Sequence, residues 1–261
     1  MRRLLLLLTF FAAAGLTACG GRKAASSGAP ACADCDIFLL IGQSNMAGRG
    51  TMLAADSLWS PDGIRLLDSA GCPVQATQPL NRYSTIRKSL SLQGVGPGVG
   101  FAERLHARTG RPLLLVVNAR GGSALSEWMP ESDYYREAVR RTRQALPYGR
   151  LRAILWHQGE SDSGHPDDYL ERLSAMVAAL RRDLGCGEVP FIAGEIARWH
   201  RHAERFNPVI GRIAERIPHS ACISSEGCAP LRDSLDPHFG RDGQLLLGER
   251  YAEKIIEMCY E

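Results

Sequence analysis

The sequence predicts an α/β protein in which a parallel sheet carries helices on both faces. Apolar segments of about 5–8 residues, the length of buried strands, alternate along the chain with amphipathic segments of about 10–17 residues. Strands and helices that alternate in this way form parallel βαβ units. The composition supports the same class, because 45% hydrophobic and 23% charged residues among 261 are ordinary for a globular chain. These values argue against a disordered, collagen-like or polytopic membrane protein.

The strands are predicted from apolar runs bounded by turn signals. The first covers Asp36 to Ile41, and the others cover residues 112–118, 151–156, 190–196 and, more weakly, 221–224. Helical patterns lie between them, at about 98–109, 133–146, 167–184, 205–216 and 243–258. Residues 50–97 are rich in Gly, Pro and Ser and show little periodicity. We interpret them as a long excursion and a candidate part of the substrate cleft.

The first residues form a targeting segment. Two arginines precede an uninterrupted apolar run over residues 4–18, which is short for a membrane span and suits the core of a signal peptide. The small residues before Cys19 resemble a bacterial lipoprotein cleavage box, with an ordinary secretory signal as the alternative. The resemblance implies cleavage after residue 18, lipid on Cys19 and a place in the bacterial cell envelope, lipid-anchored at the outer membrane or periplasmic. Gly20 points away from retention in the inner membrane.

Residues 19–35 are mostly Gly, Ala and Ser and are expected to form a flexible tether, which leaves residues 36–261 as one domain. The whole chain has a net charge of +3. Removing residues 1–18 takes two arginines from the 31 basic side chains and leaves 29 against 28 acidic ones, or +1. A nucleic-acid-binding protein normally shows a strongly basic face. We therefore expect no nucleic-acid partner, a membrane contact only through Cys19, and a monomer.

The cysteines also favour export. Seven remain without Cys19, an odd number, so at least one is free if all pairs are internal. Cys222 and Cys228 form the best local pair, across a short polar turn. Cys32 and Cys35 have the spacing of a redox motif but precede a strand instead of opening a helix, so we favour structural disulfides. A zinc site needs a second close pair of ligands at a suitable spacing, and the sequence offers no convincing one.

Ser44 is the first candidate for catalysis. It follows the first strand within Gly-Gln-Ser-Asn-Met-Ala-Gly-Arg-Gly. A helix that starts there points free N–H groups and a positive dipole end towards the serine, which favours a nucleophile and a developing oxyanion. The nucleophile elbow of α/β-hydrolases needs Gly where this chain has Met46, so that fold is not supported. The alternative for Ser44 is a helix N-cap.

Polar clusters follow later strands as well. The second strand leads to Gly121-Gly122, which allow a backbone N–H to approach a ligand or form only a tight turn. The third ends in Trp-His-Gln-Gly-Glu-Ser-Asp, a cluster that packing alone does not explain. Near the C-terminus, His238 enters the last helix beside two aspartates. A carboxylate near a histidine holds the ring in the tautomer that accepts a serine proton.

These four blocks resemble, in order and spacing, the SGNH (GDSL-type) hydrolase superfamily, within it the carbohydrate esterase family 6 and sialate O-acetylesterase group. The resemblance rests on IFLLIGQSNMAGRG, the Ala-x-Gly-Gly-Ser stretch leading to Trp128, WHQGESD and HFGRDGQLLLGERYA. It covers about residues 36–256, with 50–97 matched only loosely. It implies a flavodoxin-like three-layer α/β/α sandwich and serine-dependent removal of acetyl groups from sugar hydroxyls.

The resemblance also implies roles for single residues. The family's nucleophile falls on Ser44 and its catalytic base on His238. The oxyanion hole would use the Ser44 N–H, the N–H of Gly121 or Gly122, and the side-chain amide of Gln158. No metal and no organic cofactor is implied.

The third member of the triad is where this chain departs from its relatives. They usually carry Asp three residues before the histidine, and Leu235 stands there. Asp236 is our first choice, provided that Pro237 tightens the turn. Glu160 from the third block is second, as some relatives use that glutamate, and Asp233 is third. Two other functions remain open at this stage: a sugar-binding lipoprotein without turnover, favoured by the missing Asp, and a lipid or thioester hydrolase of the same superfamily.

Overall fold

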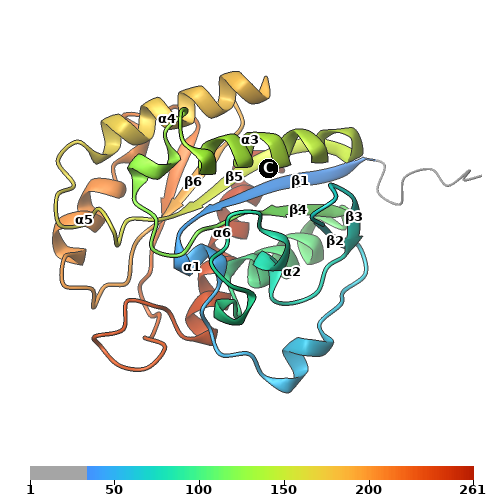
Figure 1. The fold of residues 1–261 in the computed structure, drawn as a ribbon, viewed down its shortest axis with the longest axis horizontal. Coiled ribbons are helices and arrows are strands. Elements are labelled where there is room, and N and C mark those ends of the chain that lie inside the picture. The colour runs from blue at the N-terminus through green and yellow to red at the C-terminus, as the bar shows by residue number, and fades with distance from the viewer. Residues whose placement is uncertain (1–33) are drawn as a thin grey trace, which may run out of the picture.

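The computed structural model describes residues 34–261. The predicted signal segment, nearly all of the tether and Cys19 lie outside these residues. The described chain forms a seven-stranded sheet between two layers of helices (Figure 1). Its strands are β1 (Cys35–Gly42), β2 (Ile64–Leu67), β3 (Pro73–Gln75), β4 (Leu113–Val117), β5 (Gly149–His157), β6 (Phe191–Gly194) and β7 (Ser220–Ile223).

The strand order is β3-β2-β4-β1-β5-β6-β7, and all neighbours are parallel except β2 and β3. The five strands predicted from apolar runs are β4, β1, β5, β6 and β7. Numbered among themselves, they take the flavodoxin-like order 2-1-3-4-5. The predicted three-layer α/β/α fold is therefore confirmed, with one antiparallel strand added at an edge.

The helices are α1 (Ser44–Ala47), α2 (Pro97–Thr109), α3 (Asp133–Ala145), α4 (Tyr169–Leu184), α5 (Ala203–Ile210) and α6 (Arg241–Cys259). Figure 1 shows α3 and α4 along one face of the sheet and α2 with α6 across the other. The helix expected over 205–216 ends early, at Ile210. Gly211 follows it, and a short 3₁₀ turn over Ile213–Glu215 takes the rest of the pattern. Within residues 34–261, no helix has the length and apolarity that would be needed to cross a membrane.

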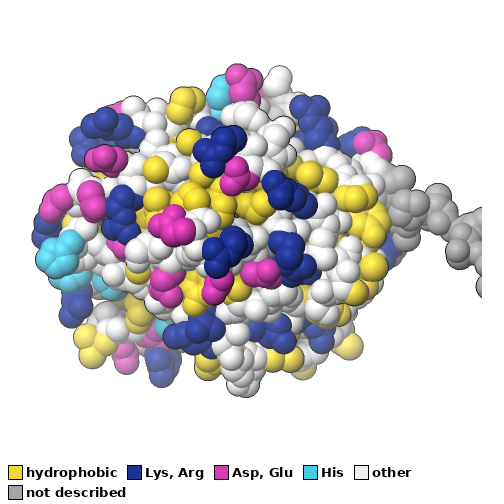
Figure 2. Space-filling model, turned by 45° about the horizontal axis from the view of Figure 1, so that its top comes forward, with side chains coloured by type: hydrophobic (Ala, Val, Ile, Leu, Met, Phe, Trp, Pro, Cys, Tyr) yellow, Lys and Arg dark blue, Asp and Glu magenta, His cyan; other side chains and the backbone are white. Residues whose placement is uncertain are grey.

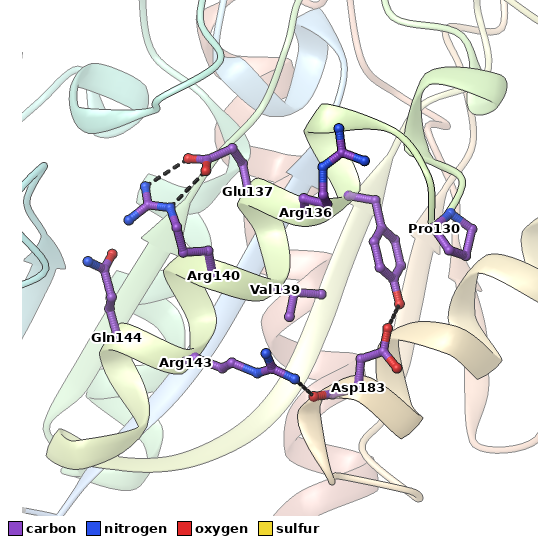
Figure 3. Close-up of a pocket in the computed structure, with 9 residues that line it drawn as sticks. Pro130, Arg136, Glu137, Val139, Arg140, Arg143, Gln144 and Asp183 are labelled. Carbon is purple, nitrogen blue, oxygen red and sulfur yellow. Dashed lines mark hydrogen bonds and ion pairs between the residues drawn. The ribbon is translucent and has the colours of Figure 1, made fainter.

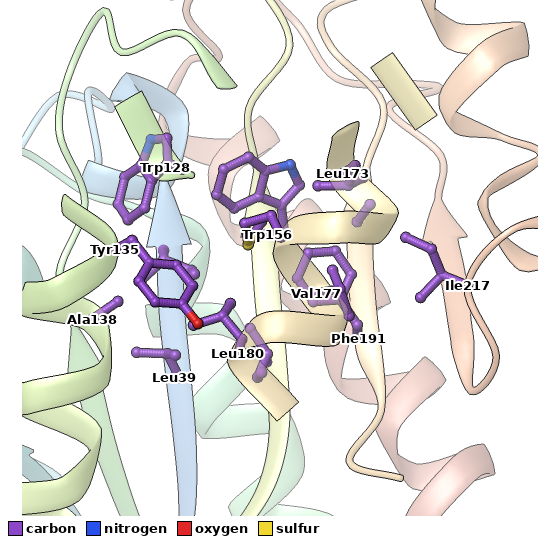
Figure 4. Packing of buried hydrophobic residues seen from close by; sticks show 14 of the residues in the cluster. Leu39, Trp128, Tyr135, Ala138, Trp156, Leu173, Val177, Leu180, Phe191 and Ile217 are labelled. Carbon is purple, nitrogen blue, oxygen red and sulfur yellow. The ribbon is translucent and has the colours of Figure 1, made fainter. Parts of the chain in front are cut away.

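The core has two halves because side chains of a strand alternate between the two faces of a sheet. In β1, Ile37, Leu39 and Ile41 pack under α3 and α4, while Phe38 and Leu40 pack against α2 and α6. Figure 4 shows part of the first half, where the buried rings of Trp128 and Trp156 meet edge to face with centroids 5.4 Å apart. Figure 2 shows the outer surface of that half, where acidic and basic side chains are interspersed around apolar ones.

Residues 50–97 are more regular than the sequence indicates. They contribute β2, which pairs with β4, and the edge strand β3. These strands have four and three residues, too few to show a period of two, and β3 begins with a proline. The interpretation of this stretch as an excursion without strands was therefore wrong at these two places.

The predicted disulfide between Cys222 and Cys228 is also wrong, since both are free thiols. Cys222 packs against the half of the core under α3 and α4, whereas Cys228 packs against the half that contains α6. The two side chains thus belong to opposite faces of the sheet, which their separation in sequence does not reveal. Among the described cysteines, Cys72, Cys186 and Cys259 are free as well. Cys32 lies outside the described residues.

Candidate active site

The three strand ends that carry the sequence blocks lie side by side, because β1 is placed between β4 and β5. The N–H of Gln43 donates to the carbonyl of His157 at 2.8 Å, and the N–H of Arg120 donates to the carbonyl of Gly42 at 2.9 Å. Successive connections leave β1 in opposite directions here, which makes this the switch point of the sheet. Such points are where α/β folds of this kind bind ligands.

Gly42 brings Ser44 to this edge. Its φ is +134°, and a Cβ added to it would lie 2.2 Å from the carbonyl oxygen of His157. Only glycine allows this close turn out of the sheet. The chain then enters α1, whose first residue is Ser44 and whose N-cap is Gln43. The alternative of Ser44 as the N-cap is therefore wrong. Ser44 is 7% exposed.

A chain of hydrogen bonds joins three side chains from distant parts of the sequence. Oγ of Ser44 lies 3.0 Å from Nε2 of His238, and Nδ1 of the same ring lies 2.7 Å from Oδ1 of Asp236. With the Nδ1 proton donated to the carboxylate, Nε2 is left to accept the serine proton. The arrangement can activate a serine hydroxyl for attack on a carbonyl.

A closed loop presents Asp236 and His238 to Ser44. Its base is an antiparallel bridge between Pro230 and Phe239, and the N–H of Leu231 donates to the carbonyl of His238 at 2.8 Å. Leu235, at the position where relatives carry Asp, is 91% exposed and points away, whereas Asp236 is 4% exposed. In this loop, the residue two places before the histidine faces the ring.

Asp236 has further partners that hold it ionised. Arg232 donates from Nε to Oδ2 at 2.6 Å, and the backbone N–H of His238 donates to Oδ1 at 3.1 Å. Burial opposes ionisation, but these bonds and the His238 ring hold the pKa of Asp236 below its usual value. Trp199 fixes the backbone by donating from Nε1 to the Asp236 carbonyl at 2.7 Å. The aspartate is thus oriented on both sides.

Glu160 and Asp233 do not contact the ring. Glu160 accepts from Nδ2 of Asn45 at 2.5 Å, and burial raises its pKa to about 7. Asn45 also donates to the carbonyl of Pro237 at 3.1 Å and accepts from the N–H of Phe239 at 3.2 Å, so it clamps both residues next to His238. Glu160 therefore reaches the histidine only through Asn45. Asp233 accepts from the N–H of Leu235 at 2.9 Å, on the outer side of the loop.

Of the two candidate glycines, Gly121 lies beside the serine. A Cβ added to Gly121 would be 3.6 Å from Cβ of Ser44, while a Cβ added to Gly122 would lie 3.4 Å from Nζ of Lys88 and, among the described residues not adjacent in sequence, within 4 Å of nothing else. Within the described part of the chain, the backbone N–H groups of Ser44 and Gly121 donate to no protein acceptor. Both are free to donate to an oxygen between them.

The side chain of Gln158 is engaged elsewhere. Its Nε2 donates to the carbonyl of Ser123 at 3.1 Å and to Oδ2 of Asp162 at 2.6 Å, and its Oε1 accepts from the hydroxyl of Tyr169 at 2.7 Å. A flipped amide would set Oε1 against two acceptors, so this orientation is fixed by its partners. Gln158 is fully buried. The structure thus places it near the site with both amide hydrogens in use.

One feature of the surface lies apart from this centre. One of the larger grooves, about 770 Å³, runs along α3 and the end of α4 (Figure 3) and contains none of the residues described above. Its charged groups are paired, as Glu137 with Arg140 and Tyr135 with Asp183. Across residues 34–261, no group of three or more His, Cys, Asp or Glu side chains is arranged to hold a metal ion.

Sequence reasoning missed Asn45, Trp199 and Arg232. The sequence could have indicated Asn45 as a site residue, since it follows Ser44 directly in a block already singled out. Arg232 had a weaker signal, four residues before Asp236. Trp199 comes from the segment after β6 and had none, because nothing in the sequence tells that this segment meets the His238 loop.

The pKa of His238 leads to a prediction about pH. Burial lowers this pKa; the hydrogen bond to Asp236 opposes the shift, and the charge of Arg49 adds to it. Only the neutral ring accepts a proton, and a lowered pKa keeps the ring neutral to lower pH. The acid limb of kcat/KM for an acetyl ester should therefore have its midpoint below about pH 6.5. Glu160→Gln is the control: the pKa of Glu160 is about 7, yet its replacement should leave this limb in place. If the acid limb of kcat/KM shifts or disappears in Glu160→Gln, the group that titrates is Glu160 and not His238.

A sequence profile of the family described as carbohydrate esterase, sialic acid-specific acetylesterase, matches residues 34–257. This span holds all four blocks and every residue of the site. The chain belongs to this carbohydrate esterase family. The match confirms the resemblance found in the sequence.

This carbohydrate esterase is similar in sequence to a plant protein and in fold to a bacterial one. It is 29% identical over 239 residues, 84% of its own length and 90% of the relative's, to the "Probable carbohydrate esterase" of Arabidopsis thaliana. An X-ray structure of that protein aligns with a TM-score of 0.76 at 27% identity, covering 86% of this chain and 99% of the other. A carbohydrate acetylesterase from Xanthomonas citri shares the fold, with a TM-score of 0.62, 16% identity, and coverage of 86% and 57%.

Proposed function

We propose that this protein is a serine esterase that removes O-acetyl groups from carbohydrates through an acetyl-enzyme. The observation that carries the proposal is the hydrogen-bonded chain from Ser44 through His238 to Asp236 at the switch point of the sheet. Membership in a carbohydrate esterase family supports acetylated sugars as the substrate class.

The proposed mechanism uses this chain in order. Nε2 of His238 takes the proton of Ser44 as its Oγ attacks the acetyl carbonyl. Asp236 keeps the proton on Nδ1 and stabilises the imidazolium that forms. The N–H groups of Ser44 and Gly121 donate to the oxyanion. His238 then returns its proton to the departing sugar oxygen, and water hydrolyses the acetyl-enzyme by the same route.

The alternatives lose support. The sugar-binding lipoprotein without turnover was favoured by the missing Asp at position 235, and the bond from Asp236 to the ring replaces that contact. The lipid or thioester hydrolase shares the serine chemistry, but the family match favours carbohydrate esters.

Acetate release tests the proposal. The wild-type domain is incubated with acetylated xylo-oligosaccharides, O-acetylated sialic acids, an acetylated phospholipid analogue and an acetyl thioester. We expect acetate from at least one of the two sugar classes at a rate well above those of the lipid and the thioester. Preference for the lipid or thioester, or no release from any ester, would overturn it. The panel also decides between xylan-type and sialic acid substrates.

We also propose that the mature protein is held in the bacterial cell envelope by lipid on Cys19. The small residues before this cysteine support the proposal. Several acyl chains give stable anchoring, whereas one binds only marginally. In membrane fractions of a bacterial host, wild type should sediment with membranes, and Cys19→Ala should be soluble or remain unprocessed. Cys72→Ala, which removes a different cysteine, is the control and should sediment like wild type. A correctly cleaved Cys19→Ala protein that stays on membranes would contradict lipid anchoring.

A further inference from the structure

The oxyanion hole has two free backbone donors and lacks a free side-chain donor from Gln158. The N–H groups of Ser44 and Gly121 are free, but both amide hydrogens of Gln158 are held by Ser123 and Asp162. For Gln158 to reach a reacting carbonyl, it would have to break bonds inside the core, where an unsatisfied polar group is costly. Another group near the serine is therefore better placed.

Arg49 is a cation near this site that forms no ion pair with a carboxylate in residues 34–261. It follows α1 and is half-buried, and its Nη1 donates to the carbonyl of Gly48 at 2.8 Å. Burial lowers its pKa, and within the described residues no carboxylate offsets this effect. A guanidinium has five N–H donors and remains charged in proteins. Removing a cation from water without pairing it to an anion destabilises the folded protein. An anion that forms nearby during the reaction would be a reason to keep the cation there.

The guanidinium lies beside Gly121, close to Ser44. A Cβ added to Gly121 would be 2.4 Å from Nη2 of Arg49 and 3.6 Å from Cβ of Ser44. The missing side chain of Gly121 therefore leaves the space into which Nη2 extends, next to the serine. The charge of Arg49 is also felt at His238, whose pKa it helps to lower. The guanidinium thus lies beside the space next to the nucleophile, and its charge acts on the base as well.

We propose that Arg49 is a further catalytic residue, whose Nη2 donates to the oxyanion beside Gly121. The inference rests on the proposed esterase function. As the bond from Oγ of Ser44 to the acetyl carbon forms, the proton of Oγ moves to His238 and the π electron pair of the carbonyl moves to its oxygen. Arg49 gives a charged hydrogen bond to that oxygen and transfers no proton. The pair returns when the bond to the sugar oxygen breaks and that oxygen takes the proton from His238.

The test measures kcat and KM of Arg49→Met on two neutral substrates, 4-nitrophenyl acetate and an acetylated xylo-oligosaccharide. We expect kcat to fall roughly 10²- to 10³-fold on both, with KM changed little, which is the usual effect of losing one oxyanion donor. Arg49→Lys should recover part of the loss. Lys88→Met is the matched control, because it removes a cation beside Gly122 without touching the site. Its kcat should stay near that of wild type.

A second variant keeps the test decisive if Arg49→Met does not fold. Gly121→Ala retains the arginine but fills its space, so it should displace Nη2 and lower kcat to a similar extent. A wild-type kcat in Gly121→Ala would overturn the proposal. Where Arg49→Met folds, the double variant Arg49→Met/Gly121→Ala should be no slower than the slower single variant, because both changes remove the same contact. Losses that multiply in the double variant would show that the two changes remove independent contacts, so Nη2 would not act in the space beside Gly121 and the proposal would be overturned.

Other outcomes separate the possible failures. If Arg49→Met keeps its kcat on neutral esters but has a raised KM for an O-acetylated sialic acid, Arg49 binds a substrate carboxylate and the oxyanion role is wrong. An unchanged Arg49→Met enzyme on every substrate would also refute it. In both cases wild type still releases acetate and Ser44→Ala does not, so the esterase proposal stands. If wild type releases no acetate, the proposed function itself has failed.

Discussion

Ser44→Ala should lower kcat on an acetylated sugar roughly 10⁴- to 10⁶-fold, the effect typical of losing a triad nucleophile. The alanine leaves His238 without a hydroxyl to deprotonate, and no acetyl-enzyme can form. The fold should persist, because the Ser44 hydroxyl makes its one side-chain hydrogen bond with His238. Initial rates of acetate release, with thermal unfolding of both proteins, measure the effect.

Ser220→Ala is the matched control for this variant. Ser220 is similarly buried, and its hydroxyl donates to the carbonyl of Ile217 at 2.7 Å at the start of β7. It should retain the wild-type kcat with at most a modest loss of stability, about 1 kcal/mol for one hydrogen bond. Ser44→Ala with near-normal turnover would remove Ser44 from the mechanism.

Asp236→Asn should lower kcat about 10⁴-fold, the size of effect that the same change has in serine proteases, where the amide favours the wrong tautomer of the histidine. Here the 2.7 Å bond from Nδ1 of His238 to the carboxylate would be lost. The amide would face Nδ1 with either an N–H donor or an oxygen that accepts more weakly. It would also lose the charged bond from Arg232. The measurement is kcat on the same acetylated sugar, compared with two other carboxylate variants.

Those two variants locate the acid of the triad. Asp233→Asn is the close control, since an asparagine oxygen can still accept from the N–H of Leu235, and its activity should stay within a few-fold of wild type. Glu160→Gln should lose less than Asp236→Asn, because Gln can still accept from Asn45 and the clamp on the His238 loop persists. If Glu160→Gln is slower than Asp236→Asn by more than tenfold, about 1.4 kcal/mol of barrier, the acid comes from Glu160.

The sequence predicts those parts of the fold that local pattern determines. The strand from Asp36 to Ile41 is apolar on both faces, so its place inside a parallel sheet was evident. Strands β2 and β3 were not predicted because their pairing, and not their own pattern, makes them strands. Likewise, the spacing of Cys222 and Cys228 does not tell that they face opposite halves of the core.

The site shows the same division. Ser44 and His238 could be found from their blocks, since each lies next to a strand end or a helix start. The sequence could rank Asp236 before Glu160 and Asp233 but could not decide among them, because contacts with distant residues set the shape of the loop: Asn45 binds Pro237, and Trp199 binds the backbone of Asp236. The orientation of Gln158 depends in the same way on Asp162 and Tyr169.

The most direct test of the serine mechanism is the mass of the protein during turnover. With 4-nitrophenyl acetate, an activated ester, acylation is fast and the acetyl-enzyme should accumulate before hydrolysis. Rapid acid quench and peptide mass analysis should find one acetyl group on the peptide that contains Ser44, and none on that peptide from Ser44→Ala. An acetyl group carried by a different side chain during turnover, with hydrolysis retained by Ser44→Ala, would contradict the mechanism.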